Sequence, residues 1–348
     1  MPDTRTDVLV VGAGPIGLET AAVLADEGHR VQVVDAGSIG DTIARQFPPA
    51  TRFFTSPERL ALRGLPVPSA TQEKTTGEEY LAYLRAFAAA HRLQVSTFTE
   101  VVAIRGRAGA FRVTVRDNWG RQSEIDTAVI VLATGGTAHP RRLGVPGEDL
   151  DGVRRALGDP HRYYGRRVLV IGGRNSAAES ALRLYRVGAR VSLAHRGEAL
   201  NPRVKHWIRP EVESLLDEGE ITRLMPREVV RIEPGRVILR EPGGTATETT
   251  ESIEVDDVLL QLGYTADRRI FELAGIPLTG ARQAPEHDPA TMATGVPGIY
   301  VVGTASAGTQ DKFDVFIENS HQHADRVAAA LAGRPAPAPT PPRPLPES

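Results

Sequence analysis

The sequence predicts an α/β fold built from two Rossmann-like dinucleotide-binding domains, because one chain pattern occurs in it twice. The pattern is an apolar run typical of a buried parallel strand, a glycine-rich turn, a helix and a second apolar strand. The spacing is the same in both copies, from Gly12 to Asp35 in the first and from Gly172 to His195 in the second. A chain of 348 residues is also long enough for two such domains.

The first copy contains Gly12, Gly14 and Gly17 in a Gly-x-Gly-x-x-Gly motif. The first glycine allows a tight turn, the second lets the backbone approach a pyrophosphate, and the third lets the helix pack close to the strand. The unpaired N–H groups at the start of the helix point at the same pyrophosphate. Asp35 closes the second strand, where an acid accepts hydrogen bonds from a ribose hydroxyl.

The second copy has Arg174 where the middle glycine is expected. Arg174 is either a phosphate ligand or an exposed residue at the start of a helix, and both interpretations stay open. His195 and Arg196 occupy the position of Asp35. Because an acid suits free ribose hydroxyls and a cation suits a 2′-phosphate, we expect FAD in the first domain and NADPH in the second.

The composition argues against several classes of protein. A formal net charge of -2 is unlike a nucleic-acid-binding protein, which is normally basic. The chain has no cysteine, so it offers neither a catalytic thiol nor a thiolate for a metal, and we expect no metal site. No apolar run approaches the about 18 residues of a membrane span, and the first residues lack the apolar segment of a signal peptide, so we expect a cytoplasmic protein. Lys74, Lys205 and Lys312 are the lysines among 41 basic residues, which we interpret as codon bias.

The first half of the chain contains further elements beyond the first copy. Residues 36–65 are rich in turn formers and aromatic residues, which is typical of an excursion that covers a ligand. In this excursion Thr55 is a candidate for a hydrogen bond to a flavin ring, although turn capping is the favoured interpretation. The spacing predicts a helix over 77–90, strands over 95–115, and a buried strand over 126–134 that leads into Ala-Thr-Gly-Gly at 133–136.

The second half predicts helices over 201–217 and 315–331, a meander over 229–239 and a strand over 255–262. A short strand over 299–302 precedes Gly303 and Thr304, where flavoproteins commonly have Gly-Asp. His321 and His323, near the start of the last helix, are interpreted as packing or surface residues, with His323 a weak candidate for catalysis. The proline-rich tail from Gly333 is expected to be extended and disordered.

With these motifs the chain resembles the thioredoxin-reductase-like flavoproteins, and within them the bacillithiol-disulfide reductase family. The combination of FFTS at 53–56, VKHWIRP at 204–210 and FIEN at 316–319 is more specific than the paired dinucleotide motifs, and the resemblance covers about residues 7–332. It implies a two-dinucleotide flavoprotein of the low-molecular-weight thioredoxin reductase type. The FAD-binding domain would have two parts, 1–140 and 265–332, with an NADPH-binding domain at 141–264 between them and a disordered tail at 333–348.

By matching position, the resemblance also implies which residues contact each cofactor. The implied FAD contacts are Gly12, Gly14, Pro15, Ile16, Gly17, Asp35, Ala36, Gln46, Thr55, Val102, Ala133, Thr134, Gly135, Gly303, Thr304, Phe316 and Ile317. The implied NADPH contacts are Gly172, Gly173, Arg174, Asn175, Ser176, Ala177, His195 and Arg196.

Two departures from the family pattern bear on mechanism. A thioredoxin reductase has Cys-x-x-Cys in the segment that reads RRALGDPHR here, at 154–162. The disulfide reductases often have a cysteine where Ile16 stands. Any mechanism that needs an enzyme thiol is therefore excluded, which leaves hydride transfer from NADPH to FAD, with the cofactors supplying the chemistry.

The electron acceptor stays open at this point. The favoured hypothesis is a reductase of a low-molecular-weight disulfide such as bacillithiol disulfide. The alternative is a ferredoxin–NADP or flavodoxin–NADP reductase, whose partner is a small electron-carrier protein. A flavin monooxygenase and a nonenzymatic nicotinamide sensor are weaker alternatives. The resemblance implies a homo-oligomer, and we expect neither nucleic acid nor a membrane as a partner.

Overall fold

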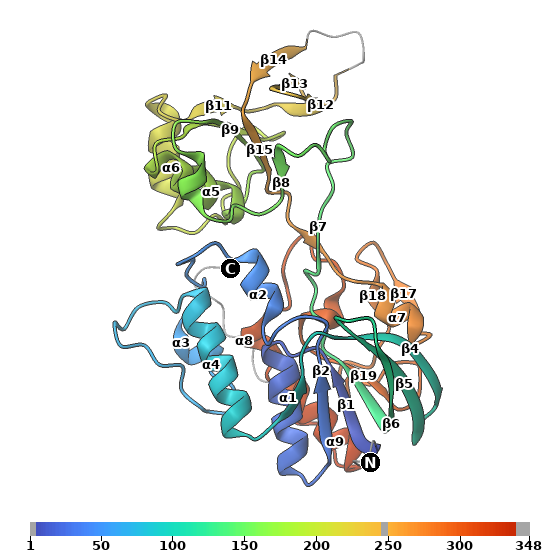
Figure 1. Cartoon of the computed structure of the whole chain (residues 1–348). Coiled ribbons are helices and arrows are strands. Elements are labelled where there is room, and N and C mark those ends of the chain that lie inside the picture. Colours follow the sequence, from blue (N-terminus) through green and yellow to red (C-terminus); the bar gives the residue numbers. More distant parts are fainter. Residues whose placement is uncertain (1–4, 245–249, 339–348) are drawn as a thin grey trace. The chain divides into compact units, whose positions relative to one another are not determined.

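The computed structural model describes residues 5–244 and 250–338, which form two compact units (Figure 1). The described part of unit 1 is 5–139 and 264–338, and that of unit 2 is 140–263 without the gap. The chain passes between the units at two short strands, β7 (His139–Pro140) and β16 (Tyr264–Thr265), which pair with each other. Unit 2 is therefore an insertion in the chain of unit 1.

Unit 1 is built on a mostly parallel sheet. Its strands are β1 (Arg5–Val11), β2 (Val31–Val34), β3 (Gln94–Ser96), β4 (Thr99–Arg107), β5 (Ala110–Asp117), β6 (Gln122–Leu132) and β19 (Ile299–Val301). Their order is β3-β2-β1-β6-β5-β4, and β19 also pairs with β6. The N-terminal half of β6 pairs antiparallel with β5, whereas its C-terminal end pairs in parallel with β19. A short ribbon of β17 (Leu278–Thr279) and β18 (Ala284–Pro285) lies outside this sheet.

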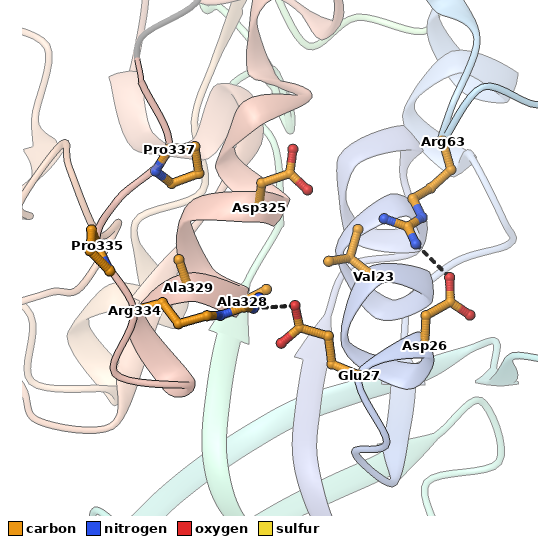
Figure 2. Close-up of a pocket in the computed structure, with 10 residues that line it drawn as sticks. All are labelled: Val23, Asp26, Glu27, Arg63, Asp325, Ala328, Ala329, Arg334, Pro335 and Pro337. Carbon is orange, nitrogen blue, oxygen red and sulfur yellow. Dashed lines mark hydrogen bonds and ion pairs between the residues drawn. The ribbon is translucent and has the colours of Figure 1, made fainter.

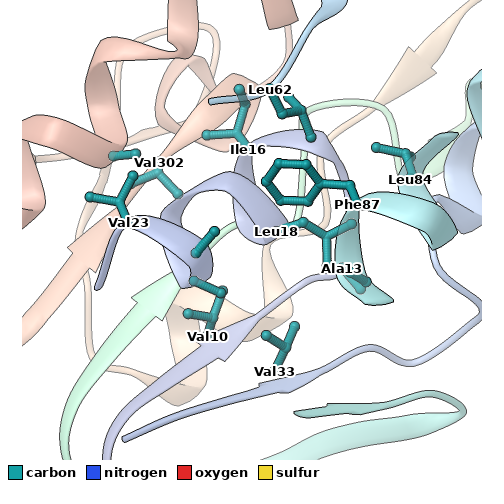
Figure 3. Close-up of a cluster of buried hydrophobic side chains, with 14 of the residues drawn as sticks. Val10, Ala13, Ile16, Leu18, Val23, Val33, Leu62, Leu84, Phe87 and Val302 are labelled. Atoms are coloured by element: carbon teal, nitrogen blue, oxygen red, sulfur yellow. The ribbon is translucent and has the colours of Figure 1, made fainter. Parts of the chain in front are cut away.

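The helices of unit 1 are α1 (Pro15–Asp26), α2 (Asp41–Gln46), α3 (Pro57–Leu60), α4 (Gly77–Ala90), α7 (Arg269–Leu273), α8 (Ile317–Ser320) and α9 (Gln322–Leu331), with the 3-10 turn η2 (Gly303–Ala307). Side chains of α1, α4 and α9 pack on one face of this sheet, and those of α7 and of the meander of β4 and β5, which continues the sheet beyond β6, pack on the other. Because strand side chains alternate between faces, Val8 and Val10 of β1 pack in the core that includes α1, α4 and α9 (Figure 3), and Leu9 and Val11 pack under the meander and α7.

The predicted helix over 77–90 is confirmed with its bounds, as α4. Its N-terminus has a capping box, in which the Thr76 hydroxyl accepts from the Glu79 N–H and the Glu79 carboxylate accepts from the Thr76 N–H. The buried face carries Tyr80, Leu84 and Phe87, at the spacing seen in the sequence. Local capping and periodicity therefore both specify this helix.

Unit 2 has an arrangement similar to that of unit 1, a parallel sheet with helices on one face and a meander on the other. Its strands and helices are β8 (Val153–Arg154), η1 (Pro160–Tyr163), β9 (Arg167–Ile171), α5 (Asn175–Arg186), β10 (Arg190–Ala194), α6 (Arg209–Asp217), β11 (Thr222–Leu224), β12 (Glu228–Glu233), β13 (Arg236–Arg240), β14 (Glu251–Glu254) and β15 (Asp257–Leu260). The parallel sheet has the order β11-β10-β9-β15-β8. Side chains of α5, α6 and η1 pack on one face, and side chains of β12, β13 and β14 pack on the other.

Two predicted helices differ from those in the structure. The helix expected over 201–217 begins at Arg209, where Pro210 suits the first turn, and residues 201–208 form turns that pack against α5. The helix expected over 315–331 begins at Ile317 and is divided into α8 and α9 at His321. The tail expected from Gly333 is described only as far as 338, without regular structure from 334 on, and 339–348 lie outside the described residues.

Candidate functional site

The glycine turn of unit 1 is packed against the end of β6. Gly12 has a φ of +114°, and a Cβ on it would lie 2.4 Å from the carbonyl oxygen of Ala133. A Cβ on Gly17 would lie 2.0 Å from the carbonyl oxygen of Gly12. Both positions therefore require glycine, the first for its backbone conformation and both for close approach.

Gly14 behaves differently from these two glycines. Its backbone is extended, with a φ of -76°, and a methyl group placed on it would meet no atom within 4 Å. Pro15 then occupies the first turn of α1, where a missing N–H costs nothing. The open space thus lies where the N-terminus of α1 begins, as a bound pyrophosphate would require.

The Asp35 carboxylate is held against the same turn. One carboxylate oxygen accepts from the N–H of Ala13 at 2.6 Å, and the other accepts from the N–H of Gly37 at 2.7 Å, across Ala36. Burial raises the pKa of Asp35, although these two N–H groups favour its charged form. The acid is therefore fixed at the end of β2, beside the turn.

The chain after β6 returns to this turn and carries an unpaired buried hydroxyl. The N–H of Ala133 donates to Val11, and the N–H of Gly136, just past Gly135, donates to the Thr304 hydroxyl at 3.0 Å. The hydroxyl of Thr134 is buried and has no hydrogen-bond partner within the described residues. A buried hydroxyl without a partner is unfavourable, so Thr134 offers a hydrogen bond to a ligand.

Gly303 lies close in space to Ile16 of α1 and to His323. A Cβ on Gly303 would lie 3.2 Å from the Ile16 Cβ, and Ile16 itself is buried. Nδ1 of His323 accepts from the N–H of Gly303 at 3.0 Å. Burial lowers the pKa of His323 to about 4, helped by the charge of Arg326, so its ring is neutral at pH 7. His323 therefore supports the backbone of Gly303, and a packing or surface role without catalysis stays a prediction for it.

The structure brings Gln46 to this cluster and places Thr55, Val102, Phe316 and Ile317 on nearby elements. The Gln46 carboxamide donates to the carbonyl of Thr137. Thr55 is buried just before α3, and Val102 lies in β4. The N–H of Phe316 donates to the Asn319 side chain, and Ile317 begins α8, which packs on η2. Contact of these residues with FAD stays a prediction.

The turn of unit 2 has the same frame with a different middle residue. Gly172 has a φ of +148°, and a Cβ on it would lie 2.3 Å from the carbonyl oxygen of Gln261. Arg174 is extended, with a φ of -118°, so an arginine adopts the backbone of this position without strain. Ala177, where unit 1 has Gly17, is fully buried.

His195 lies over the unit 2 turn, at the position that Asp35 holds in unit 1. A Cβ on Gly173 would lie 2.5 to 2.7 Å from three atoms of the His195 ring, so the ring covers that glycine. Burial lowers the pKa of His195, and the charges of Arg196 and Arg174 lower it further. The neutral ring leaves the positive charge here to the two arginines, of which Arg196 is exposed.

Lys205 and Glu179, which were not among the expected NADPH contacts, hold this turn. The Asn175 side chain accepts from the N–H of Lys205 at 2.7 Å, and the ammonium of Lys205 lies 3.2 Å from the Glu179 carboxylate. Asn175 and Ser176, both expected to contact NADPH, begin α5. One signal was available, since Glu179 follows Gly172 at the spacing by which Glu19 follows Gly12, and both glutamates are buried.

The family model of the pyridine nucleotide-disulphide oxidoreductases matches residues 9–303, which include both turns. The chain belongs to this family. Its members are oxidoreductase enzymes, so the alternative of a nonenzymatic sensor is set aside. The resemblance drawn from the sequence is confirmed at this level.

Individual relatives agree with the family. The chain is 30% identical over 326 residues to Bacilliredoxin reductase Bdr of Bacillus subtilis, which is 94% of this chain and 97% of that protein. It is 28% identical over 322 residues to a ferredoxin–NADP reductase of Thermus thermophilus, covering 87% and 85% of the two proteins. Bacillithiol Disulfide Reductase Bdr (YpdA) from Bacillus cereus is a similar solved structure, with a TM-score of 0.88 at 29% identity over 94% of this chain and 99% of that one. Thioredoxin reductase of T. acidophilum shares the fold, with a TM-score of 0.72 at 21% identity.

The cofactors of this oxidoreductase are FAD and NADPH. The described residues fit them: unit 1 has open space at Gly14, a fixed acid and the unpaired Thr134 hydroxyl, and unit 2 has an arginine pair beside its turn. Within the described residues no cluster of three or more His, Asp or Glu side chains is arranged to hold a metal ion. Nor does any helix in the described ranges combine the length and apolar character needed to cross a membrane.

A pocket of about 360 Å³ lies elsewhere in unit 1, between α1, α9 and the start of the tail (Figure 2). Two ion pairs border it, Arg63 with Asp26 and Arg334 with Glu27. Its lining residues are Val23, Asp26, Glu27, Arg63, Asp325, Ala328, Ala329, Arg334, Pro335 and Pro337. None of these is among the residues expected to contact FAD or NADPH, so the pocket is separate from that set of residues.

Proposed function

We propose that this flavoprotein passes electrons from NADPH through FAD to a low-molecular-weight disulfide of the bacillithiol disulfide type, without an enzyme thiol. The supporting observation is the similarity to Bacilliredoxin reductase Bdr over 94% of this chain and 97% of that protein. FAD would lie in unit 1 at Gly14, Asp35 and Thr134, and NADPH in unit 2 at the Gly172 turn.

The proposed roles of the chain's own groups are binding and orientation. Bound FAD and NADPH would supply the hydride-transfer and two-electron chemistry of the reaction. Asp35 would accept from a ribose hydroxyl, the Thr134 hydroxyl would gain a partner, and Arg196 would pair with the 2′-phosphate. The buried side chain of Ile16 stands where related reductases often have a cysteine, so the acceptor disulfide would exchange electrons with the flavin directly.

A second candidate acceptor is a small electron-carrier protein. The 28% identity to a ferredoxin–NADP reductase, over 87% of the chain, supports it, and such a reaction needs no cysteine. The name of the Bacillus subtilis relative adds a third acceptor to the same test, an oxidised bacilliredoxin.

The deciding experiment reduces the FAD-loaded protein with NADPH under anaerobic conditions and then follows reoxidation of the flavin. Bacillithiol disulfide, oxidised bacilliredoxin, ferredoxin, flavodoxin and oxygen are compared at equal concentration. The proposal expects bacillithiol disulfide to be fastest, and it fails if oxidised bacilliredoxin, ferredoxin, flavodoxin or oxygen reoxidises the flavin faster. If NADPH leaves the flavin oxidised, the cofactor assignment fails as well.

The same proposal includes a homo-oligomer, as the resemblance implies, and the cytoplasmic location expected from the sequence. Light scattering after size-exclusion chromatography measures the first point, and a monomeric mass at micromolar concentration would contradict it. Fractionation of the source cells tests the second point.

A further inference from the structure

A buried ion pair of unit 2 joins α5, the helix that follows the glycine turn, to the segment that follows β10. Glu179 is 8% exposed and Lys205 7% exposed, and the Lys205 Nζ lies 3.2 Å from the Glu179 Oε2. The other Glu179 oxygen accepts from Arg183 at 2.8 Å, one turn along α5. Glu179 therefore fixes a cation that comes from outside its own helix.

The segment that carries Lys205 is tied to the turn at two further points. The N–H of Asn201 donates to the carbonyl of Gly173 at 2.8 Å, and the N–H of Lys205 donates to the Asn175 side chain at 2.7 Å. Gly173 and Asn175 flank Arg174, so the segment 201–205 is hydrogen-bonded to the residues on both sides of Arg174, where α5 starts. Lys205 also leads into α6, because its carbonyl accepts from Ile208 and Arg209.

A lysine at this position is informative in a chain with so few of them. The sequence has 41 basic residues, of which Lys74, Lys205 and Lys312 are lysines. Lys205 is also buried, with its Nζ 5.7 Å from the centre of the Trp207 ring. A compact ammonium fits such a site, whereas a guanidinium is larger and planar, so codon bias does not explain this lysine.

We propose that Lys205 and Glu179 are positioning residues that hold the unit 2 turn in the form that binds the diphosphate of the nicotinamide nucleotide. This inference rests on the proposed placement of NADPH in unit 2. A buried ion pair adds little net stability on average, but it favours one arrangement of the groups that it joins. Here that arrangement is the Gly173–Asn175 turn against the segment 201–205.

The proposal predicts a loss of binding that is the same for both nucleotides. Lys205→Met should raise the Kd of NADP+ and of NAD+ about tenfold each, because the turn that binds the diphosphate, which both nucleotides share, would no longer be held in place. Titration calorimetry measures these constants without turnover. The limiting rate of flavin reduction by NADPH and the FAD content should stay within about twofold. The Lys205–Glu179 pair would affect binding of the nucleotide in the ground state and in the transition state equally.

The chain offers a control in an exposed ion pair that links α5 to α6, the helix that follows Lys205. Arg186 of α5 pairs with Glu211 of α6 at 2.7 Å, and both side chains are about half exposed. Arg186→Met should leave both constants unchanged, because this exposed pair lies at the other end of α5 from the turn (Figure 1).

Some results would overturn the proposal. An unchanged Kd in folded Lys205→Met would do so, and so would a loss confined to NADP+, which would make Lys205 a ligand of the 2′-phosphate. If Lys205→Met does not fold, Glu179→Leu/Lys205→Met replaces it, since this double variant removes both charges of the ion pair and leaves Arg183, which is partly exposed, to solvent. The same criteria apply to it. Absence of flavin reduction in the unsubstituted protein would refute the proposed function, while the calorimetric comparison would still test Lys205.

Discussion

The two units carry the same turn and close it with opposite chemistry. In unit 1 an acid, Asp35, follows β2 and is held by the N–H of Ala13 in the turn and by the N–H of Gly37, whereas in unit 2 the ring of His195 covers the turn and Arg196 stands beside it. The buried glutamates of the two units also have different partners. Glu19 faces the imidazole of His321, and Glu179 faces the ammonium of Lys205. The comparison shows that both units share the backbone frame of the turn, while the charges of the side chains around it differ. We propose that these side chains set the choice of nucleotide and the response to pH.

The largest expected difference between the units lies at the third position of the motif. Gly17→Ala would place a Cβ 2.0 Å from the carbonyl oxygen of Gly12, so we expect a loss of about 3 kcal/mol in unfolding free energy and loss of FAD. Unit 2 already has Ala177 there, and Ala177→Gly should cost about 1 kcal/mol. Flavin absorbance and denaturant unfolding measure both changes. A yellow Gly17→Ala protein of normal stability would show that unit 1 tolerates the packing of unit 2.

Arg196 tests the charge difference at the strand ends. Arg196→Ala should raise the KM for NADPH about ten- to a hundredfold and leave that for NADH nearly unchanged, because a charge-assisted contact is worth roughly 1.5–3 kcal/mol. Arg190→Ala, at the opposite end of β10, is the control and should affect neither. Steady-state kinetics with both nucleotides decides the matter, and equal losses would place the 2′-phosphate elsewhere.

The two buried glutamates predict different pH dependence. Nδ1 of His321 lies 2.7 Å from the Glu19 carboxylate and Nε2 lies 3.0 Å from the carbonyl of Arg59, so both ring nitrogens face acceptors and the ring is charged in this arrangement. Burial opposes protonation, but the hydrogen bond to Glu19, its charge and the Arg59 carbonyl outweigh burial and raise the pKa of His321.

Because this pKa is raised above its unfolded value of about 6.5, the stabilisation is fully present below pH 6.5 and is lost as the pH rises through the folded pKa. Hydrogen exchange should show α1 and α9 becoming less protected over this range, while α5, whose glutamate pairs with a lysine, stays constant. His321→Gln should cost about 1–3 kcal/mol at pH 6 and flatten the dependence. A pH response of the same size in α5 would contradict this account.

The smallest expected effect concerns the link between Gly136 and Thr304. Thr304→Val keeps the shape of the side chain but leaves the N–H of Gly136 without its acceptor, so we expect about 1 kcal/mol of lost stability and an about fivefold weaker Kd for FAD. Fluorescence titration of the apoprotein with FAD measures the second value. Thr304→Ser, which keeps the hydroxyl, should remain near the unsubstituted protein.

The parts of the fold that were predictable are those that local chemistry specifies. The turn at Gly12 and the helix α4 follow from glycine spacing and from periodicity with a cap, so the fold class and α4 could be predicted. The helix expected over 201–217 was too long because residues 201–205 are held by Gly173 and Asn175, which no window of the sequence contains.

The details of the candidate site were hidden for the same reason. The Thr304 hydroxyl accepts from the N–H of Gly136, and His323 accepts from the N–H of Gly303. Both hydrogen bonds form because segments far apart in the sequence meet in space. The motifs therefore located the two turns, while the side chains that hold those turns in place required the structure.

The insertion of unit 2 into the chain of unit 1 has a consequence for synthesis on the ribosome. β6 pairs with β19, Ile130 beside Ile299, and residues 140–263 of unit 2 are translated between them. Since domains tend to fold as they emerge, the inserted unit can become compact while the sheet of unit 1 still lacks its last strand. A compact insertion keeps its two ends together at β7 and β16, which shortens the loop that must close before β19 can pair with β6. Unit 1 is thus completed last, and the folded unit 2 holds the two parts of the unit 1 chain close together while it forms.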